Sequence, residues 1–437
     1  MESSQRDTGL KRAIGTRSLA ASVVNMVIGA SIFVVPAALA ANVGTYAPLV
    51  IIACAIAVGS VAICFAEGGS RIPSSGGAYA YIEAAFGPLA AYSAGTLLWV
   101  SSVLACGGIV AALADVAVSV VRPGLAGPVH AAVIVGAIGL VSAVNLGGVA
   151  HGTRLVNATT LVKLFPLVIF VAFGAFSIHG GNFAGQARDS EIGRAAILAL
   201  FAFMGMETSL CASGEVDHPE RTIPRALAIS MVAVTLLYVA IQIVAQGMLG
   251  PALASSTAPL ADAAARIHPA LRLLLLGGAA LSMFGYVCSD ILGSPRILFA
   301  FARDGLLPRV LGRVHPRSHA PYVAILCYSG LALVLALTGT FVELAVLSAL
   351  ASAAFYIAGC AAAWRLARRG VAQSGTPLNF RWLTMAMIVA IVSMLALIAL
   401  ASHDEIVGLL ALIGASIAVY LVQIRVARWR RVPVAPL

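Results

Sequence analysis

The sequence predicts an all-α integral membrane protein of about twelve transmembrane helices. Of its 437 residues, 61% are hydrophobic and only 10% are charged, and the mean hydropathy is +1.00. A soluble domain carries about 25% charged residues, so this chain has too little charge to cover a surface in water. Its apolar residues form long continuous runs rather than short alternating strands. That pattern favours helices, which satisfy their own backbone hydrogen bonds in lipid, over a closed β-barrel.

Twelve apolar runs are long enough to cross a bilayer, which takes about 20 helical residues. The first run follows a polar, basic tail, residues 1–17, and has no convincing signal-cleavage site, so we expect it to be retained as a helix. The predicted spans are 18–41, 46–67, 87–120, 129–147, 153–178, 194–213, 225–249, 271–301, 321–338, 341–364, 382–401 and 406–427.

The distribution of basic residues predicts the orientation. Positive residues gather on the cytoplasmic side of membrane proteins. With the N-terminus inside, most of the 27 Lys and Arg residues fall on that side, while Lys163 and Arg296 fall within spans. We therefore expect a multi-pass protein of the cell (cytoplasmic) membrane with both termini in the cytoplasm. The basic residues left outside are Arg122, Arg188, Arg194, Arg266 and Arg272.

No pattern in the chain indicates a cofactor, a metal or a nucleic acid. The seven cysteines lie in apolar runs without CxxC spacing. The chain has no HExxH, GxSxG or phosphate-binding loop, which disfavours a membrane enzyme and an ATP-driven pump. No separate soluble domain is expected, and the apolar stretch 261–267 in an outer loop predicts only a short surface helix.

Two spans contain small residues near the middle of the membrane. Residues 27–33 read VIGASIF and residues 201–208 read FAFMGMET. These spans lie five apart and run in opposite directions, as expected for an inverted repeat whose discontinuous helices meet at the midplane. The N-terminal end of a half-helix attracts an anion, and freed carbonyl groups attract a cation. Paired breaks therefore suit a small zwitterion, although close helix packing at small residues is the alternative.

Four segments carry a resemblance to a known family. They are 29–33 (GASIF), 67–88 (EGGSRIPSSGGAYAYIEAAFGP), 201–226 (FAFMGMETSLCASGEVDHPERTIPRA) and 296–308 (RILFAFARDGLLP). With these, the chain resembles the amino acid–polyamine–organocation (APC) transporter superfamily along nearly its whole length. It departs from the family pattern at Ser31, where the family usually has glycine.

The resemblance implies a leucine-transporter-type fold. Residues 18–364 would form a ten-helix core of two inverted repeats, 18–178 and 194–364. Residues 365–437 would add helices 11 and 12 and a short tail. The resemblance implies secondary transport of amino acids by alternating access, as a permease or exchanger. Symport with an ion, exchange and uniport all remain open.

The resemblance also implies a substrate site between helices 1, 3, 6 and 8. The substrate carboxylate would meet backbone N–H groups at 30–32, and the amino group would meet carbonyl groups near 27–28 and 201–204. Phe201 would also close over the substrate. The residues expected at the site from the two breaks are Val27, Ile28, Gly29, Ala30, Ser31, Ile32, Phe201, Ala202 and Met204.

Three ionisable residues within spans are further candidates, because charge is costly in a bilayer. Lys163 resembles a lysine that replaces a sodium ion in family members, which predicts sodium-independent transport and would permit proton coupling; snorkelling to the cytoplasmic side is the alternative. Glu207 would either titrate during transport or hold the unwound segment in place. Asp290 falls near a substrate side-chain position, where it would attract a cationic group or pair with a hydroxyl group away from the cavity.

The expected partners are a small-molecule substrate, an amino acid or an amine, and the lipid bilayer; no protein partner is indicated. The alternative function is transport of polyamines or other organic amines, because a substrate without a carboxylate needs no anion site. A transport-like nutrient receptor is disfavoured by the short tails, and a channel by the paired breaks.

Overall fold

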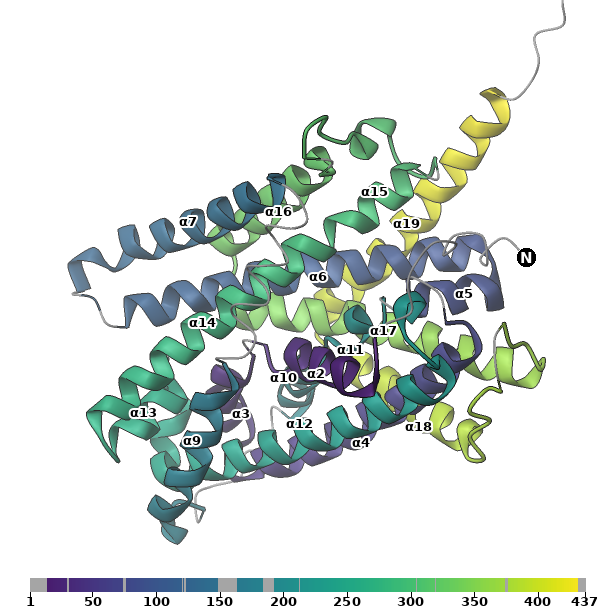
Figure 1. The fold of residues 1–437 in the computed structure, drawn as a ribbon. Helices are drawn as coiled ribbons and strands as arrows, with labels where there is room; N and C mark the ends of the chain where they lie inside the picture. Colours follow the sequence, from purple (N-terminus) through teal and green to yellow (C-terminus); the bar gives the residue numbers. More distant parts are fainter. Residues whose placement is uncertain are drawn as a thin grey trace, which may run out of the picture.

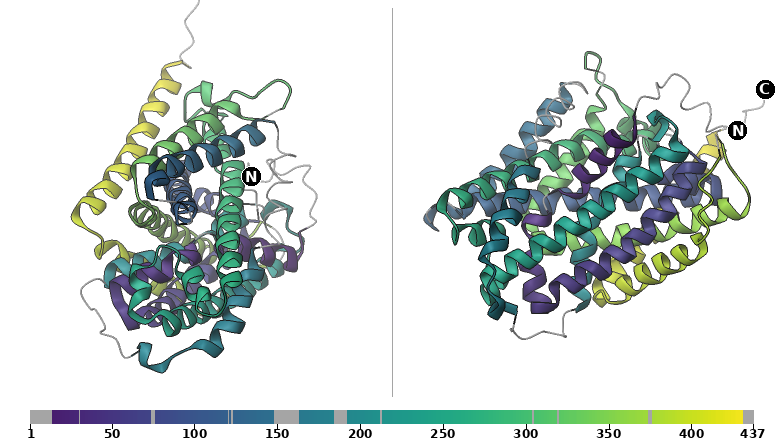
Figure 2. Two further views of the ribbon diagram at one scale, coloured as in Figure 1. Left: turned by 90° about the vertical axis from the view of Figure 1, so that its left-hand side faces the viewer. Right: turned by 60° about the horizontal axis from the view of Figure 1, so that its bottom comes forward.

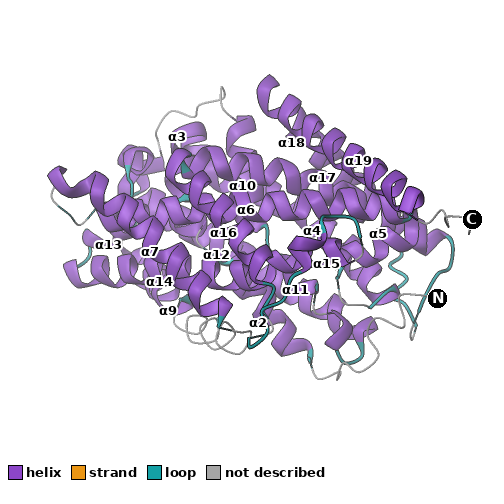
Figure 3. Ribbon diagram, turned by 90° about the horizontal axis from the view of Figure 1, so that it is seen from above, coloured by secondary structure: helices purple, strands orange, loops and turns teal. Residues whose placement is uncertain are grey.

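The structure, a computed structural model, is a bundle of α-helices (Figure 1). It describes residues 14–29, 31–73, 76–119, 121, 123–147, 163–183, 192–211, 213–303, 305–318, 320–373 and 376–430. Within these residues the elements are helices joined by short connections, and the only β-type pairing is a single parallel bridge between Ile14 and Val216 (Figure 3). The prediction of an all-helical chain is confirmed for this part of the molecule.

The elements in chain order are α2 (Thr16–Val27), η1 (Ser31–Phe33), α3 (Val35–Val43), η2 (Gly44–Tyr46), α4 (Ala47–Arg71), α5 (Ala78–Phe86), α6 (Pro88–Val118), η3 (Pro123–Leu125), α7 (Ala126–Leu146), α9 (Leu164–Gly174), η4 (Ala175–Ser177), η5 (Gly180–Phe183), α10 (Ile192–Phe203), α11 (Met206–Leu210), η6 (Ser213–Glu215), α12 (Pro219–Leu249), η7 (Gly250–Ser255), α13 (Pro259–Ala265), α14 (Pro269–Gly293), α15 (Pro295–Arg303), η8 (Arg309–Gly312), α16 (Tyr322–Thr338), α17 (Phe341–Arg368), α18 (Leu383–Ala399) and α19 (His403–Arg430).

Many of these helices suit a lipid environment. In the described residues, eight helices are long and apolar enough to cross a membrane, and three shorter apolar helices are Leu164–Ser177, Tyr322–Thr338 and Leu383–Ala399. Large apolar side chains face outward, such as Phe176, which is 91% exposed, and Leu236, which is 67% exposed. Such faces are unfavourable in water and favourable against lipid. Each predicted span overlaps a described helix, but residues 153–162 of the fifth lie outside the described part.

The centre of the bundle is formed by α6 and α17, which pack along each other (Figure 1). Glycines of α6 permit this approach and that of α16. A Cβ at Gly107 would lie 2.9 Å from Leu335 Cβ, and one at Gly108 would lie 3.2 Å from Leu344 Cβ. Small residues of this kind let helix backbones approach closely in membranes. On another side of the bundle α12 lies along α4, and α19 runs along the outside, as the two views of Figure 2 show.

A buried ion pair ties the end of α4 to the segment before α18. Arg71 Nη2 lies 2.8 Å from Glu67 Oε1, and the two side chains are 3% and 0% exposed. Glu67 also accepts hydrogen bonds from the backbone N–H groups of Asn379 and Phe380, and Arg71 donates to the carbonyl oxygen of Val371. Because both charges have these further partners, the pair avoids the penalty of an unsatisfied buried charge.

One predicted element differs in its surroundings. The stretch expected to form a surface helix is α13, and its Leu260, Ala261, Ala263 and Ala264 are each at most 4% exposed. The alanines leave so little side-chain bulk that α13 packs closely against α14. The prediction of a helix there was right, and the prediction of a surface position was wrong.

Candidate functional site

Two helices are interrupted near the centre of the bundle. The α2 helix ends at Val27, and the chain becomes helical again only in η1 and α3. The α10 helix ends at Phe203, and α11 begins at Met206, so Met204 and Gly205 lie between them. The interruptions at Gly29 and Gly205 fall where the small residues of the sequence predicted them.

Gly205 brings the two interruptions into direct contact. Its φ is +119°, a conformation that residues with a Cβ rarely adopt. A Cβ at this position would lie 2.9 Å from the carbonyl carbon and oxygen of Met26 and 3.2 Å from the nitrogen of Val27. Glycine therefore permits both the turn out of α10 and the close approach of that turn to the end of α2.

Glu207 fills the second interruption with a carboxylate. Its two oxygens lie 3.2 and 3.1 Å from the backbone nitrogen of Gly205, and the Tyr356 hydroxyl donates to one of them over 2.7 Å. The first N–H groups of a helix lack partners within the helix, and a carboxylate there is stabilised by the helix dipole. The structure thus shows the holding contact expected for Glu207. Its titration during transport stays a prediction.

Carbonyl groups at the first interruption accept hydrogen bonds from distant elements. Lys163 donates from Nζ to the carbonyl oxygen of Asn25 over 2.5 Å, and Ser282 donates to that of Gly29 over 2.6 Å. Lys163 is only 3% exposed, so its ammonium is buried against the end of α2 rather than extended toward an aqueous surface. Among the described residues it forms no ion pair. Its positive charge is offset by carbonyl oxygen instead.

One hydroxyl group bridges the two interruptions. The Tyr238 Oη lies 2.8 Å from the carbonyl oxygen of Val27 and 3.0 Å from that of Ala202. These carbonyls belong to the last turns of α2 and α10, where helices leave carbonyl groups without partners. Tyr238 on α12 therefore ties the ends of both half-helices to one point.

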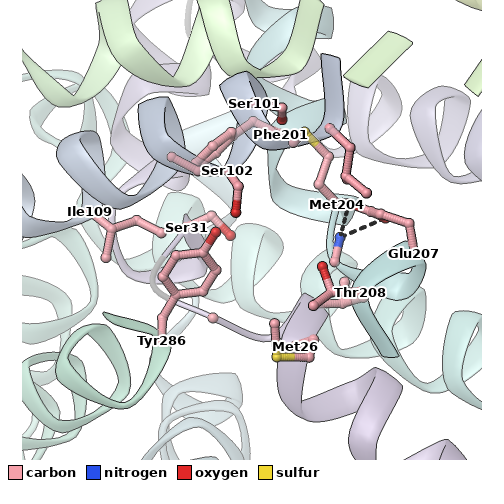
Figure 4. Close-up of a pocket in the computed structure, with 15 residues that line it drawn as sticks. Met26, Ser31, Ser101, Ser102, Ile109, Phe201, Met204, Glu207, Thr208 and Tyr286 are labelled. Carbon is pink, nitrogen blue, oxygen red and sulfur yellow. Dashed lines mark hydrogen bonds between the residues drawn. The ribbon is translucent and has the colours of Figure 1, made fainter. Parts of the chain in front are cut away.

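A pocket lies between the two interruptions (Figure 4). It contains about 480 Å³ of empty space, including the part that opens to solvent. Its lining comes from both interruptions, from α6 and from α14: Met26, Val27, Gly29, Ser31, Leu98, Ser101, Ser102, Ala105, Ile109, Phe201, Met204, Gly205, Glu207, Thr208 and Tyr286.

Hydroxyl groups give this pocket much of its polarity. Ser31, Ser102 and Tyr286 direct their hydroxyl oxygens toward one region of it (Figure 4). The Tyr286 ring also covers Gly29, where a Cβ would lie 3.2 Å from the ring. The sequence reasoning did not single out Ser102 or Tyr286. Tyr286 could have been found from Asp290, because the two residues lie one helical turn apart on α14.

The structure brings some of the predicted residues to the pocket and not others. Ile28, Ile32 and Ala202 are buried but are not among its lining residues, and Ala30 lies outside the described residues. Lys163 and Asp290 are buried beyond the lining. The predicted residues that do line the pocket are Val27, Gly29, Ser31, Phe201, Met204 and Glu207.

Asp290 lies behind Ser102. It is 2% exposed, and its carboxyl group forms hydrogen bonds with the hydroxyl groups of Ser102, Ser294 and Tyr328. Ser102 separates it from the pocket, since Ser102 lines the pocket and Asp290 does not. In this structure Asp290 pairs with hydroxyl groups. A direct contact with substrate stays a prediction.

Membrane-length helices around a pocket between two interrupted helices are typical of membrane transport proteins. The sequence model of the family described as amino acid permease matches residues 14–426. The chain belongs to this amino acid permease family, within the superfamily that the four sequence segments predicted. It is accordingly a multi-pass membrane transporter and not an enzyme.

Characterised and uncharacterised transporters are among its relatives. An uncharacterized transporter of Mycobacterium tuberculosis, Rv1979c, is 30% identical over 340 residues, which cover 71% of this chain and 70% of the relative. The branched-chain amino acid permease BcaP of Bacillus subtilis is 26% identical over 347 residues, 73% of each chain. The serine/threonine exchanger SteT of the same organism is 26% identical over 378 residues, 83% of this chain and 85% of SteT.

Proposed function

We propose that the protein carries amino acids across the cell membrane by alternating access. The observation that carries the proposal is the pocket bounded by both helical interruptions, which touch each other at Gly205 and Met26. The proposal includes twelve spans with both termini in the cytoplasm. It also includes a five-plus-five inverted repeat in residues 18–364, in which the two interrupted helices occupy corresponding positions.

The two ends of a zwitterion would meet different parts of the site. The carboxylate would face the N–H groups that begin η1, beside the Ser31 hydroxyl, and the ammonium would face carbonyl groups at the ends of α2 and α10. The carbonyls of Val27 and Ala202 already accept hydrogen bonds from Tyr238. For the ammonium we therefore favour the carbonyl of Met26, a residue that lines the pocket. The carbonyl of Phe201, which also lines it, accepts a hydrogen bond from the Met204 N–H over 3.3 Å and would use its second lone pair. Phe201 would close over the bound substrate.

Lys163 supports sodium-independent transport. Its ammonium lies 2.5 Å from a carbonyl oxygen at the end of α2, the kind of ligand a bound cation would take. A tethered positive charge would remove the need for a sodium ion there. We propose that a proton gradient drives net uptake instead. Exchange of one amino acid for another would be the simplest part of the same transport cycle.

A counterflow screen tests the proposal. Liposomes containing the purified protein would be loaded with one unlabelled amino acid or polyamine and given the same compound in labelled form. Each compound would be tested in turn, with and without sodium. We expect counterflow of at least one amino acid and no dependence on sodium. Counterflow of amines alone would favour the amine-transporter alternative and overturn the proposal. A strict sodium requirement would overturn the role of Lys163 while leaving amino acid transport intact.

A further inference from the structure

Three oxygens form a closed ring of short contacts behind the pocket. The Ser102 Oγ lies 2.5 Å from Asp290 Oδ1 and 2.5 Å from Ser294 Oγ, and Ser294 Oγ lies 2.9 Å from the same Asp290 oxygen. The other carboxylate oxygen accepts from the Tyr328 hydroxyl. The ring joins α6, α14 and the turn that begins α15.

The ring needs one more proton than its serines supply. Each hydroxyl group has one hydrogen to donate, so Ser102 and Ser294 can fill two of the three contacts. With Asp290 ionised, the third contact would bring two oxygens together with no hydrogen between them. With Asp290 protonated, three hydrogens serve three contacts. The geometry therefore matches the neutral acid.

The described residues around Asp290 offer its carboxylate no ion-pair partner. The titratable groups around it are Tyr328 on α16, Cys106 on α6, and Tyr286 on its own helix. An ionised carboxylate buried without a cation is costly, so proton loss must be compensated by water or substrate reaching the ring.

We propose that Asp290 is the proton-binding site of the transport cycle and exchanges its proton with the pocket through Ser102. In the release step the Asp290 O–H bond breaks and a new O–H bond forms on Ser102. The original Ser102 hydrogen passes to a water molecule in the pocket, leaving a carboxylate and a hydronium ion. Reprotonation reverses these steps. The inference rests on the proposed function, and it assigns the coupling proton to a group that does not touch the substrate.

The variant Asp290→Asn tests the site. An amide keeps the shape of the acid and a hydrogen to donate, but it cannot release a proton at neutral pH. We expect amino acid counterflow within about threefold of wild type, a change below about 1 kcal/mol. We also expect loss of substrate-dependent proton movement, followed with a pH-sensitive dye inside the liposomes. The matched control is Asp115→Asn, an acid near the end of the same α6 helix whose side chain is 55% exposed, and it should keep both activities.

The outcomes separate this inference from the proposed function. Substrate-dependent proton movement in Asp290→Asn would overturn the inference. Counterflow with no proton movement in wild type would overturn it too, while leaving amino acid transport standing. No counterflow in folded wild-type protein would instead overturn the proposed function. Loss of counterflow in a folded Asp290→Asn protein would assign Asp290 to the substrate and overturn the inference.

A second variant keeps the test decisive if Asp290→Asn fails to fold. Ser294→Ala removes both contacts of the Ser294 hydroxyl group, with Ser102 and with Asp290, and so changes the hydrogen bonding of the acid. If Asp290 carries the coupling proton, the midpoint of the pH dependence of proton-driven uptake should shift from that of wild type. The control is Ser329→Ala, which also removes a buried hydroxyl but one that contacts Ser142 instead. An unchanged midpoint in Ser294→Ala would contradict the inference.

Discussion

The two helical interruptions that face each other across the pocket are held in different ways. At the first, after α2, the carbonyls of Asn25, Val27 and Gly29 accept from side chains 138, 211 and 253 residues away in the sequence. At the second, after α10, the N–H of Gly205 is held by Glu207, two residues along the chain. These contacts at the first interruption come from distant elements, whereas the second combines a local contact from Glu207 with contacts from Tyr238 and Tyr356 on other helices.

This difference indicates which substitutions should disrupt each interruption. A single substitution at Gly205 should disrupt the second interruption, because the geometry of that interruption depends on this glycine. The first should weaken in steps, since several side chains share its carbonyl groups. Four substitutions test this contrast, and they are ordered by the size of the loss we expect.

Gly205→Ala should have the largest effect. An alanine at φ +119° is strained, by about 1–3 kcal/mol for such a conformation. Its Cβ would also lie 2.9 Å from the Met26 carbonyl. We expect counterflow to fall at least about 100-fold, equivalent to about 2.8 kcal/mol. Gly330→Ala is the control, because a Cβ on that α16 residue meets nothing within 4 Å. Normal counterflow in Gly205→Ala would refute the glycine requirement.

Lys163→Met should have the next largest effect. It removes a charged donor from the Asn25 carbonyl, a hydrogen bond worth about 1.5–3 kcal/mol. We expect counterflow to fall about 10- to 100-fold. Lys163→Gln keeps a neutral donor and separates the hydrogen bond from the charge. Equal activity of the Gln variant and wild type would show that the positive charge is dispensable.

Glu207→Gln should have a smaller effect, because the amide oxygen can still accept the Gly205 N–H. We expect counterflow to fall about 3- to 10-fold, the loss of roughly 1 kcal/mol of charge-assisted bonding. Since we assign the coupling proton to Asp290, the pH dependence of uptake should persist. Uptake that no longer responded to pH would transfer the proton role to Glu207.

Tyr238→Phe should have the smallest effect of the four. It removes the hydroxyl that serves the carbonyls of Val27 and Ala202, and a neutral hydrogen bond contributes about 1 kcal/mol. We expect a lower melting temperature in detergent and counterflow reduced by less than about tenfold. Tyr46→Phe is the control, since Tyr46 is 42% exposed. A Tyr238→Phe protein as stable as this control would show that the hydrogen bonds of the Tyr238 hydroxyl do not stabilise the protein.

The same contrast explains what the sequence could predict. Gly205 and Glu207 are close neighbours in the chain, so the second interruption was visible as a local pattern of small residues and an acid. Tyr238 and Ser282 donate to carbonyls more than 200 positions away, and such contacts leave no local pattern. The apolar runs predicted the helices for a similar local reason. The burial of α13 was missed because its partner surface lies on another helix.

Equilibrium binding by purified protein tests the central claim most directly, namely that the two interruptions together hold both charges of an amino acid. The labelled amino acid found by counterflow would be competed with its decarboxylated amine and with its methyl ester. We predict that each competitor binds at least about 100-fold more weakly than the amino acid, since each lacks the negative charge. Competition by the amine at the same concentration as the amino acid would contradict it.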